Sequence, residues 1–267
     1  MDNRPIGVFD SGLGGLTAVK ALHQLMPEEN IIYFGDTGRM PYGPRSVEQL
    51  RRMARQDLAF VGSFGVKAVI AACGTVSSNA GDILESYPLP VVGVLKAGVN
   101  ALARTGGREC AAVIATQASI DSGSFARAFA EAAPGRPLVS VACPALVPLI
   151  ESGHTAPDDQ ALLAALEEYL GPIKQAGVSA LLLGCTHYGI IEDAIRSVLG
   201  PEAALVCASE SAARELQAVL TENQLTGGEG REEYYTSGSV EAFTAAASAF
   251  LGREIEGRVR QAPLMEV

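Results

Sequence analysis

Short, fully apolar runs alternate along this chain with longer segments of mixed apolar and polar residues. One such run, residues 178–183, is rich in leucine and is flanked by Gly177 and Gly184. Runs of this kind are typical of strands that are buried on both faces of a parallel sheet. The alternation of strand and helix patterns therefore predicts the α/β fold class with mainly parallel sheets.

The expected elements follow from these runs and from the turn-forming residues between them. Strands are expected in residues 4–9, 30–35, 89–95, 138–144, 204–209 and 233–238, and in the apolar parts of 65–75, 110–123 and 177–187. Helices are expected in residues 16–25, 47–62, 157–175, 210–220 and 240–251. A new unit begins near residue 97, and the elements after the polar loop 222–230 are expected to return to one of the two units.

Two of the apolar runs are copies of one pattern. Residues 65–75 (GVKAVIAACGT) align without gaps on residues 177–187 (GVSALLLGCTH), so Cys73 and Cys185 occupy equivalent positions 112 residues apart. In open α/β sheets, ligands bind beyond the carboxyl ends of the strands. The repeat therefore predicts two pseudo-two-fold-related α/β domains, each of which presents one cysteine to an active site in the cleft between them.

Two thiols on opposite walls of a cleft suit the inversion of a carbon centre, in which a base removes a proton from one face and an acid supplies one to the other. A cysteine at a helix amino terminus has a lowered pKa, so one thiol can act as the base and its partner as the acid. Asp10 and His187 are the neighbours expected to accept, donate or orient protons. A substrate carboxylate would be held by strand-end N–H groups and hydroxyl side chains, for which the candidates are Ser11, Thr75, Thr116, Ser119 and Thr186.

Composition narrows the range of functions. The chain has 267 residues, 48% of them hydrophobic, and a formal charge of −10, which argues against binding to nucleic acid or to an anionic membrane. No apolar run is long enough to span a bilayer and residues 1–5 do not resemble a signal peptide, so a cytoplasmic location is expected. Five cysteines without a disulfide-like framework suit reduced thiols.

Other kinds of site fit the sequence less well. Three scattered histidines and no Cys-x-x-Cys provide no familiar metal-ligand spacing, and no cofactor motif is visible. The glycine-rich turn 10–17 matches neither the dinucleotide fingerprint nor the Walker pattern. A pyridoxal phosphate enzyme is disfavoured because Lys96 alone among the lysines lies at a strand end. A Cys-His hydrolase needs only one cysteine and leaves the repeat unexplained.

Five blocks of the sequence resemble those of the glutamate racemases, and they occur in that family's order. The blocks are GVFDSGLGGLT (7–17), DTGRMPYG (36–43), ACGT (72–75), ACPALVPLIESG (142–153) and GCTHY (184–188). The likeness covers nearly the whole chain. The resemblance implies a cofactor-independent enzyme that interconverts L- and D-glutamate and supplies D-glutamate for peptidoglycan.

The resemblance also implies residue roles and domain boundaries. Cys73 would act on D-glutamate with the support of Asp10, and Cys185 would act on L-glutamate with the support of Glu151 and His187. The residues that line the substrate would be Ser11, Pro41, Tyr42, Gly43, Gly74, Thr75, Thr116, Ser119 and Thr186. The first domain would comprise residues 1–97 and 209–267, and the second residues 98–208. Besides the small-molecule substrate glutamate, the resemblance leaves open a second copy of the chain, in a homodimer, as a partner.

Three departures from the family pattern leave alternatives open. Family members usually have Asn where this chain has Gly74, Glu-Pro where it has Lys96-Ala97, and Pro-Leu where it has Gly189-Ile190. The first departure would remove a substrate hydrogen bond worth about 0.5–1.5 kcal/mol. The alternatives are a racemase of aspartate or another amino acid, and a weakly active or inactive protein that binds acidic amino acids.

Overall fold

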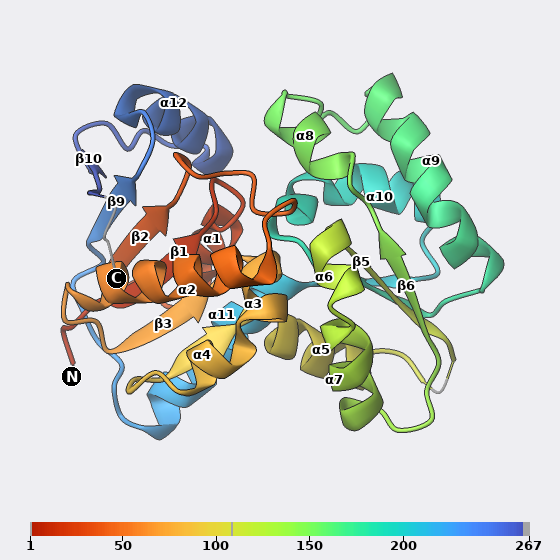
Figure 1. The fold of residues 1–267 in the computed structure, drawn as a ribbon, viewed down its shortest axis with the longest axis horizontal. Coiled ribbons are helices and arrows are strands. Elements are labelled where there is room, and N and C mark those ends of the chain that lie inside the picture. Colours follow the sequence, from red (N-terminus) through yellow and green to blue (C-terminus); the bar gives the residue numbers. More distant parts are fainter. Residues whose placement is uncertain (1, 108, 264–267) are drawn as a thin grey trace.

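Two parallel sheets, each covered by helices, make up the described part of the chain (Figure 1). The computed structural model describes residues 2–107 and 109–263. The larger sheet has the strand order β10-β9-β2-β1-β3-β4 and the smaller sheet has the order β6-β5-β7-β8. We call each sheet with its helices the larger half and the smaller half. The predicted α/β class with parallel sheets is confirmed, because the paired strands of both sheets run parallel.

The strands are short, and the central ones are buried along their whole length. The strands are β1 (Ile6–Asp10), β2 (Ile31–Gly35), β3 (Ala68–Ala71), β4 (Val91–Gly93), β5 (Ala111–Ala115), β6 (Leu138–Ala142), β7 (Ala180–Leu183), β8 (Ala204–Cys207), β9 (Glu232–Thr236) and β10 (Val259–Gln261). Helices cover both faces of such a strand, so neither face needs polar side chains. This burial accounts for the continuous apolar runs of the sequence.

The helices connect these strands. They are α1 (Leu16–Leu25), α2 (Val47–Gly62), α3 (Gly74–Asn79), α4 (Gly81–Glu85), α5 (Val94–Arg104), α6 (Gln117–Asp121), α7 (Ser124–Ala132), α8 (Leu146–Glu151), α9 (Gln160–Gln175), the 3₁₀ helix η1 (Thr186–Ile191), α10 (Glu192–Leu199), α11 (Ala208–Glu222) and α12 (Val240–Leu251). Polar side chains cap the amino termini of several of these helices. Ser46 and Gln49 form a capping box at α2, and Asp159 accepts a hydrogen bond from the N–H of Leu162 at α9.

Most predicted elements are confirmed, but β10 and the helices α3 to α8, η1 and α10 were not predicted, and two of the predicted strands end early. The strand expected in residues 89–95 ends at Gly93, where Val94 already begins α5. The strand expected in 204–209 ends at Cys207, and α11 follows directly. In both places the apolar run continues because the first helical turn is buried as well, so hydrophobicity does not mark the boundary.

The internal repeat is confirmed at the level of the fold. The cysteine strands β3 and β7 occupy equivalent places, since the order β2-β1-β3-β4 in one sheet corresponds to β6-β5-β7-β8 in the other. Cys73 directly precedes α3 and Cys185 directly precedes η1. Each half therefore presents one cysteine at the carboxyl end of its third strand.

The carboxyl-terminal segment returns to the larger half. Strand β9 pairs with β2, and β10 pairs with β9. Helices α5 and α11 pack on each other and on strands of both sheets (Figure 1). The expected domain boundaries at residues 97/98 and 208/209 lie within or beside these two helices and stay a prediction. Within residues 2–107 and 109–263, the structure contains no helix with the length and apolar character needed to cross a bilayer.

A buried ion pair ties this returning segment to the start of the chain. The Nζ atom of Lys67 lies 2.5 Å from Oε2 of Glu29, and both side chains are almost fully buried. The same ammonium donates hydrogen bonds of 2.7 Å to the carbonyl oxygens of Asp2 and Gly227. Gly227 in turn donates its N–H to Oε1 of Glu29 at 2.9 Å. The pair thus joins the amino terminus, the segment before β3 and the loop before β9.

Removing one member of this pair should destabilise the fold strongly. We expect Lys67→Met to lower the free energy of unfolding by about 3–5 kcal/mol, because it leaves the Glu29 carboxylate buried without its countercharge. Lys174→Met is the matched control, since Lys174 pairs with Glu167 at the surface, where an ion pair contributes little. Urea unfolding of both variants measures the difference. Equal stabilities would contradict the assigned role of Lys67.

Candidate active site

The carboxyl ends of the two cysteine strands meet where the halves contact each other. Gly74, next to Cys73, packs against the backbone of Gly184, next to Cys185. Both cysteines are free thiols and are buried, with 4% and 8% of their surfaces exposed. The structure therefore brings the two predicted thiols to one region, from opposite halves of the molecule.

The larger half surrounds Cys73 with Ser11 and Asp10. The Sγ atom of Cys73 lies 3.6 Å from the hydroxyl of Ser11. Asp10, the last residue of β1, is fully buried, and its Oδ2 atom accepts hydrogen bonds from the N–H groups of Gly12 (3.2 Å) and Gly15 (2.9 Å). Its Oδ1 atom is also buried but has no hydrogen-bond partner among the described residues. A buried carboxylate oxygen without a partner can accept a proton donor that approaches it.

The expectation of a lowered thiol pKa is wrong for Cys73. Burial and the nearby charge of Asp10 raise the pKa of Cys73 to about 12, although the N–H of Val76 in α3 and the hydroxyl of Ser11 act in the opposite direction. Desolvation of the thiolate outweighs the helix terminus because α3 is only six residues long and the sulfur is buried. Cys73 is therefore a neutral thiol at pH 7 and is suited to donate a proton.

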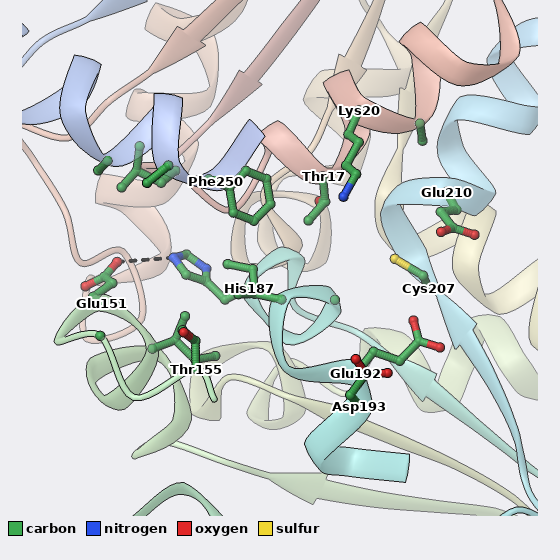
Figure 2. A pocket seen from close by; sticks show the side chains of 18 of the residues that line it. Thr17, Lys20, Glu151, Thr155, His187, Glu192, Asp193, Cys207, Glu210 and Phe250 are labelled. Carbon is green, nitrogen blue, oxygen red and sulfur yellow. Dashed lines mark ion pairs between the residues drawn. The ribbon is translucent and has the colours of Figure 1, made fainter. Parts of the chain in front are cut away.

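The smaller half places an imidazole and a carboxylate behind Cys185. The Nδ1 atom of His187 lies 3.8 Å from the sulfur of Cys185, and its Nε2 atom lies 3.2 Å from Oε1 of Glu151 (Figure 2). The Nε2 atom is buried and has no hydrogen-bond partner among the described residues, so its contact with Glu151 is an ion pair. Glu151 ends α8, and its side chain is 24% exposed. The three groups form a line from the sulfur towards solvent.

The imidazole of His187 is protonated at neutral pH. Burial of the ring opposes protonation most strongly, but the contacts with Cys185 and Glu151 outweigh it and raise the pKa of His187 to about 10. A protonated ring between a sulfur and a carboxylate can donate to either of them. The two cysteines thus have different surroundings, a carboxylate near Cys73 and an imidazolium beside Cys185.

Hydroxyl groups from the two halves meet close to the cysteines. The Oγ1 atoms of Thr75 and Thr116 lie 3.1 Å apart, and Thr116 lies 2.9 Å from the hydroxyl of Ser119. Thr116 also accepts a hydrogen bond from the N–H of Ser119 at the start of α6, which is the capping role open to such residues. Thr186 follows Cys185 and packs against Gly14 of the larger half. With Ser11 beside Cys73, all five predicted hydroxyl residues therefore lie at contacts within or between the halves.

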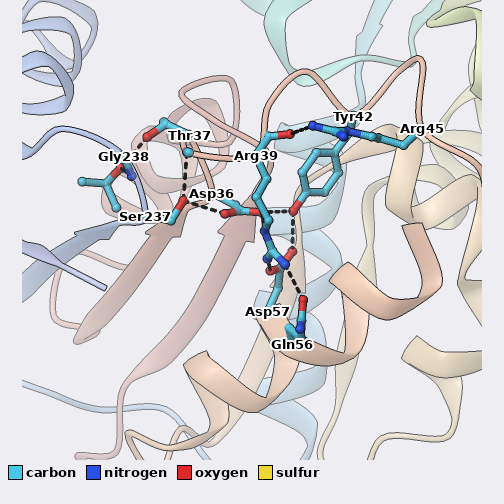
Figure 3. Close-up of polar contacts among 11 residues, drawn as sticks. Asp36, Thr37, Arg39, Tyr42, Arg45, Gln56, Asp57, Ser237 and Gly238 are labelled. Atoms are coloured by element: carbon cyan, nitrogen blue, oxygen red, sulfur yellow. Dashed lines mark hydrogen bonds and ion pairs between the residues drawn. The ribbon is translucent and has the colours of Figure 1, made fainter. Parts of the chain in front are cut away.

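The loop that carries Pro41, Tyr42 and Gly43 is held by a buried polar network (Figure 3). The hydroxyl of Tyr42 donates to Asp36 and lies 3.1 Å from Oδ2 of Asp57. Arg39 bridges both carboxylates, with Nε 2.5 Å from Asp36 and Nη2 2.9 Å from Asp57. Burial and the nearby charge of Asp36 raise the pKa of Asp57 well above its usual range, in spite of Arg39. The Tyr42 hydroxyl thus binds the two carboxylates that hold the loop. A substrate would therefore contact this loop through atoms other than that hydroxyl.

A cavity of about 820 Å³ opens on the outer side of His187. Figure 2 shows that α1, η1, α11 and α12 contribute to its wall. Its charged lining includes Lys20, Glu151, Glu192, Asp193 and Glu210. Glu151 is thus reached from this cavity, whereas the sulfur of Cys185 lies on the other side of the imidazole. In the part of the chain that the structure describes, no three His, Cys, Asp or Glu side chains are grouped as metal ligands would be.

Two glycines of the turn after β1 form part of the site although the sequence reading did not assign them to it. A Cβ atom on Gly14 would lie closer than 3.0 Å to the side chains of Thr186 and His187, and one on Gly15 would lie 2.5 Å from Cβ of Asp10. The signal was present in the glycine-rich turn 10–17. The role of Gly14 could not be inferred from it, because the contact partners Thr186 and His187 lie more than 170 positions away in the sequence.

Comparisons with known proteins agree with this geometry. Residues 16–216 match the family model described as Asp/Glu/Hydantoin racemase. The glutamate racemase of Desulforudis audaxviator is 36% identical over 261 residues, which cover 94% of this chain and 95% of that protein. The structure is similar to a glutamate racemase isoform of Bacillus anthracis (TM-score 0.93, 31% identity, 99% of each chain). It is also similar to the glutamate racemase of Francisella tularensis in complex with D-glutamate (TM-score 0.90, 35% identity, 99% of each chain).

The contact between His187 and Glu151 should affect the pKa of the His187 ring. We expect Glu151→Gln to lower the pKa of His187 below its value of about 10, because one of the two contacts that favour the charged ring is lost. The favourable contribution of this ring to stability is complete below pH 6.5 and is lost as the pH rises through about 10, so the variant should lose it at lower pH. The ring-proton NMR signal of His187 measures the titration.

Glu192→Gln is the matched control for this titration. Glu192 lines the same cavity but pairs with Arg196 rather than with His187. We expect this variant to titrate as the wild-type protein does. Identical titration curves for Glu151→Gln and the wild type would show that Glu151 does not stabilise the charged ring.

Proposed function

This chain belongs to the Asp/Glu/Hydantoin racemase family, and on that premise we propose that it is a glutamate racemase that interconverts L- and D-glutamate without a cofactor. The observation that carries this proposal is the pair of cysteines at equivalent strand ends of two similar halves. Each cysteine has a different group for handling protons, Asp10 in one half and His187 in the other. This asymmetry supports an assignment of one base and one acid.

In the direction from L- to D-glutamate, Cys185 acts as the base. Its thiolate takes the α-proton, the Cα–H bond breaks, and the electron pair passes towards the substrate carboxylate. The charged ring of His187 stabilises the thiolate, and Glu151 holds the ring in its charged form. Cys73, a neutral thiol because of its raised pKa, donates its proton to the opposite face of Cα and so completes the inversion.

The reverse direction uses the same atoms. After one turnover Cys73 is the thiolate and Cys185 is the thiol, so the enzyme is ready to act on D-glutamate. Asp10 supports Cys73 in this direction, because its buried Oδ1 atom, which has no partner among the described residues, is an acceptor that a thiol or a substrate ammonium group can approach. Proton transfer to and from Cys73 requires a neighbouring group that can accept a hydrogen bond from its thiol. The carboxylate of Asp10 is the neighbouring group of this kind.

The substrate carboxylates require donors that are fixed before the reaction. The hydroxyl groups of Ser11, Thr75, Thr116, Ser119 and Thr186, with the backbone N–H groups at the starts of α3 and η1, supply them. The loop of Pro41, Tyr42 and Gly43 lines the remaining side, held by the network around Asp36 and Asp57. Gly74 contributes backbone rather than a side chain.

The biological setting is part of the same proposal. D-glutamate formed by this chain would be used for peptidoglycan, and thereby for the cell wall and cell shape, and the reaction would take place in the cytoplasm. A homodimer remains part of the hypothesis. Analytical ultracentrifugation of the purified chain distinguishes monomer from dimer.

The first test measures racemisation directly. In D2O without added cofactor, we expect the protein to exchange the α-proton of L- or D-glutamate for deuterium and to bring the optical signal of either enantiomer to zero. Aspartate assayed in parallel distinguishes the proposed substrate from its shorter homologue. Exchange with neither amino acid, combined with calorimetric binding of glutamate, would instead indicate a binding protein without this activity.

The second test removes each thiol separately. We expect Cys73→Ser and Cys185→Ser each to lower kcat by roughly 100- to 10,000-fold, because an alcohol is a much weaker acid than a thiol and does not form at neutral pH the anion that would act as the base. Cys110→Ser is the control, since this half-buried thiol contacts the carbonyl of Ala111 at 3.4 Å and belongs to neither cysteine motif. A cysteine whose replacement leaves kcat at the wild-type value has no part in the mechanism.

A further inference from the structure

Gly74 stands beside the cysteines at a point where the backbones of the two halves are in contact. It is the first residue of α3, directly after Cys73, and it is buried. A Cβ atom at this position would lie closer than 3.0 Å to the carbonyl oxygen of Gly184 and 3.8 Å from Cα of Cys185. Real Cβ atoms essentially never approach other atoms more closely than 3.0 Å. Any residue other than glycine therefore requires one of the two strand ends to move.

The backbone of Gly184 has little freedom to move away. Its N–H donates a hydrogen bond of 2.8 Å to the carbonyl of Ile114 in the neighbouring strand. A Cβ atom on Gly184 would lie 2.9 Å from that carbonyl and from the ring of Phe125, so its other side is closely packed as well. The carbonyl that faces Gly74 is thus held by the smaller sheet itself, and unlike a side chain it cannot rotate to another position.

The opposing helix is held as firmly. The carbonyl of Gly74 accepts a hydrogen bond of 2.7 Å from the hydroxyl of Ser78, and the N–H of Ser77 donates to the carbonyl of Cys73 at 2.9 Å. The hydroxyl of Ser124 in the smaller half donates to the carbonyl of Ser78 at 2.7 Å. Local adjustment of α3 would break the two bonds within the larger half, whereas separation of the halves would break bonds between them, such as the one from Ser124 to Ser78. The remaining response to an added side chain is separation of the two halves.

From this geometry we propose that Gly74 is a positioning residue that permits closure of the two halves and thereby sets the separation of the sulfurs of Cys73 and Cys185. Sequence reasoning interpreted the glycine as the loss of a side chain that would bind substrate. The contact with Gly184 indicates a different role for Gly74. Without a side chain at this position, the backbone of the other half can approach. The effect of Gly74 on catalysis rests on the proposed function. Its effect on how closely the two halves approach does not.

A kinetic comparison tests the catalytic consequence. We expect Gly74→Ala to lower kcat on the order of 100-fold with a smaller change in KM, because a misplacement of about 1 Å between reacting groups has that effect on rate. Gly81→Ala is the matched control. Gly81 is also the first residue of a neighbouring helix, but a Cβ atom there meets nothing within 4 Å. A kcat for Gly74→Ala within twofold of the control would overturn the proposal.

A labelling experiment tests closure without any activity assay. The cysteines of wild type, Gly74→Ala and Gly81→Ala are modified with a small aromatic disulfide reagent, and mass spectrometry gives the rate at each cysteine. We expect Cys73 and Cys185 to react several times faster in Gly74→Ala than in the other two proteins. Cys143, fully buried in the smaller half, should react at the wild-type rate in all three.

The labelling rates separate the alternatives. Wild-type rates at Cys73 and Cys185 in Gly74→Ala would overturn the proposal, because the halves would then close around the added methyl group. Faster labelling of Cys143 as well would also overturn it, since Gly74 would then be required for folding rather than for closure. Faster labelling of Cys73 and Cys185 alone, in a protein that racemises nothing, would support closure and reject the proposed function.

Discussion

The chemistry proposed for this protein depends on the contact between the carboxyl ends of β3 and β7. Parallel sheets direct these ends to one edge, and two similar halves that face each other place two such edges together. The approach is so close that backbone meets backbone at Gly74 and Gly184, with side chains meeting a glycine again at Gly14. Gly74 and Gly14 are therefore conditions for the site, because a side chain at either point would meet the other half and keep the halves apart.

Closure removes the two sulfurs from water, and this desolvation decides their chemistry. At Cys73 it dominates, raises the pKa to about 12 and leaves a proton donor. In the smaller half, burial of the charged His187 ring is unfavourable by itself. Its contacts with Cys185 on one side and Glu151 on the other compensate for this burial. Similar backbones thus provide different environments, which is what a reaction with one acid and one base requires.

Support for the site extends beyond the residues near the sulfurs. In the loop 36–46, Arg39 forms ion pairs with the buried carboxylates of Asp36 and Asp57. The hydroxyl of Ser237, from the carboxyl-terminal segment, donates a hydrogen bond of 2.6 Å to Asp36. That segment is fixed in turn through the larger sheet and the Lys67–Glu29 pair. The tail of the chain therefore contributes to the site through its packing on β2, although none of the predicted site residues belongs to it.

The α/β class, the repeat and the equivalence of Cys73 and Cys185 could be inferred from the amino-acid sequence alone, because continuous apolar runs indicate buried parallel strands and the two copies align without gaps. The sequence also pointed to Asp10, His187 and the hydroxyl residues, since all of them follow strand ends. The pKa of Cys73, the contact of Gly74 with Gly184 and the engagement of Tyr42 by Asp57 were decided only by the tertiary structure. Each of them depends on desolvation or on contacts between residues far apart in the chain, and no local pattern records either.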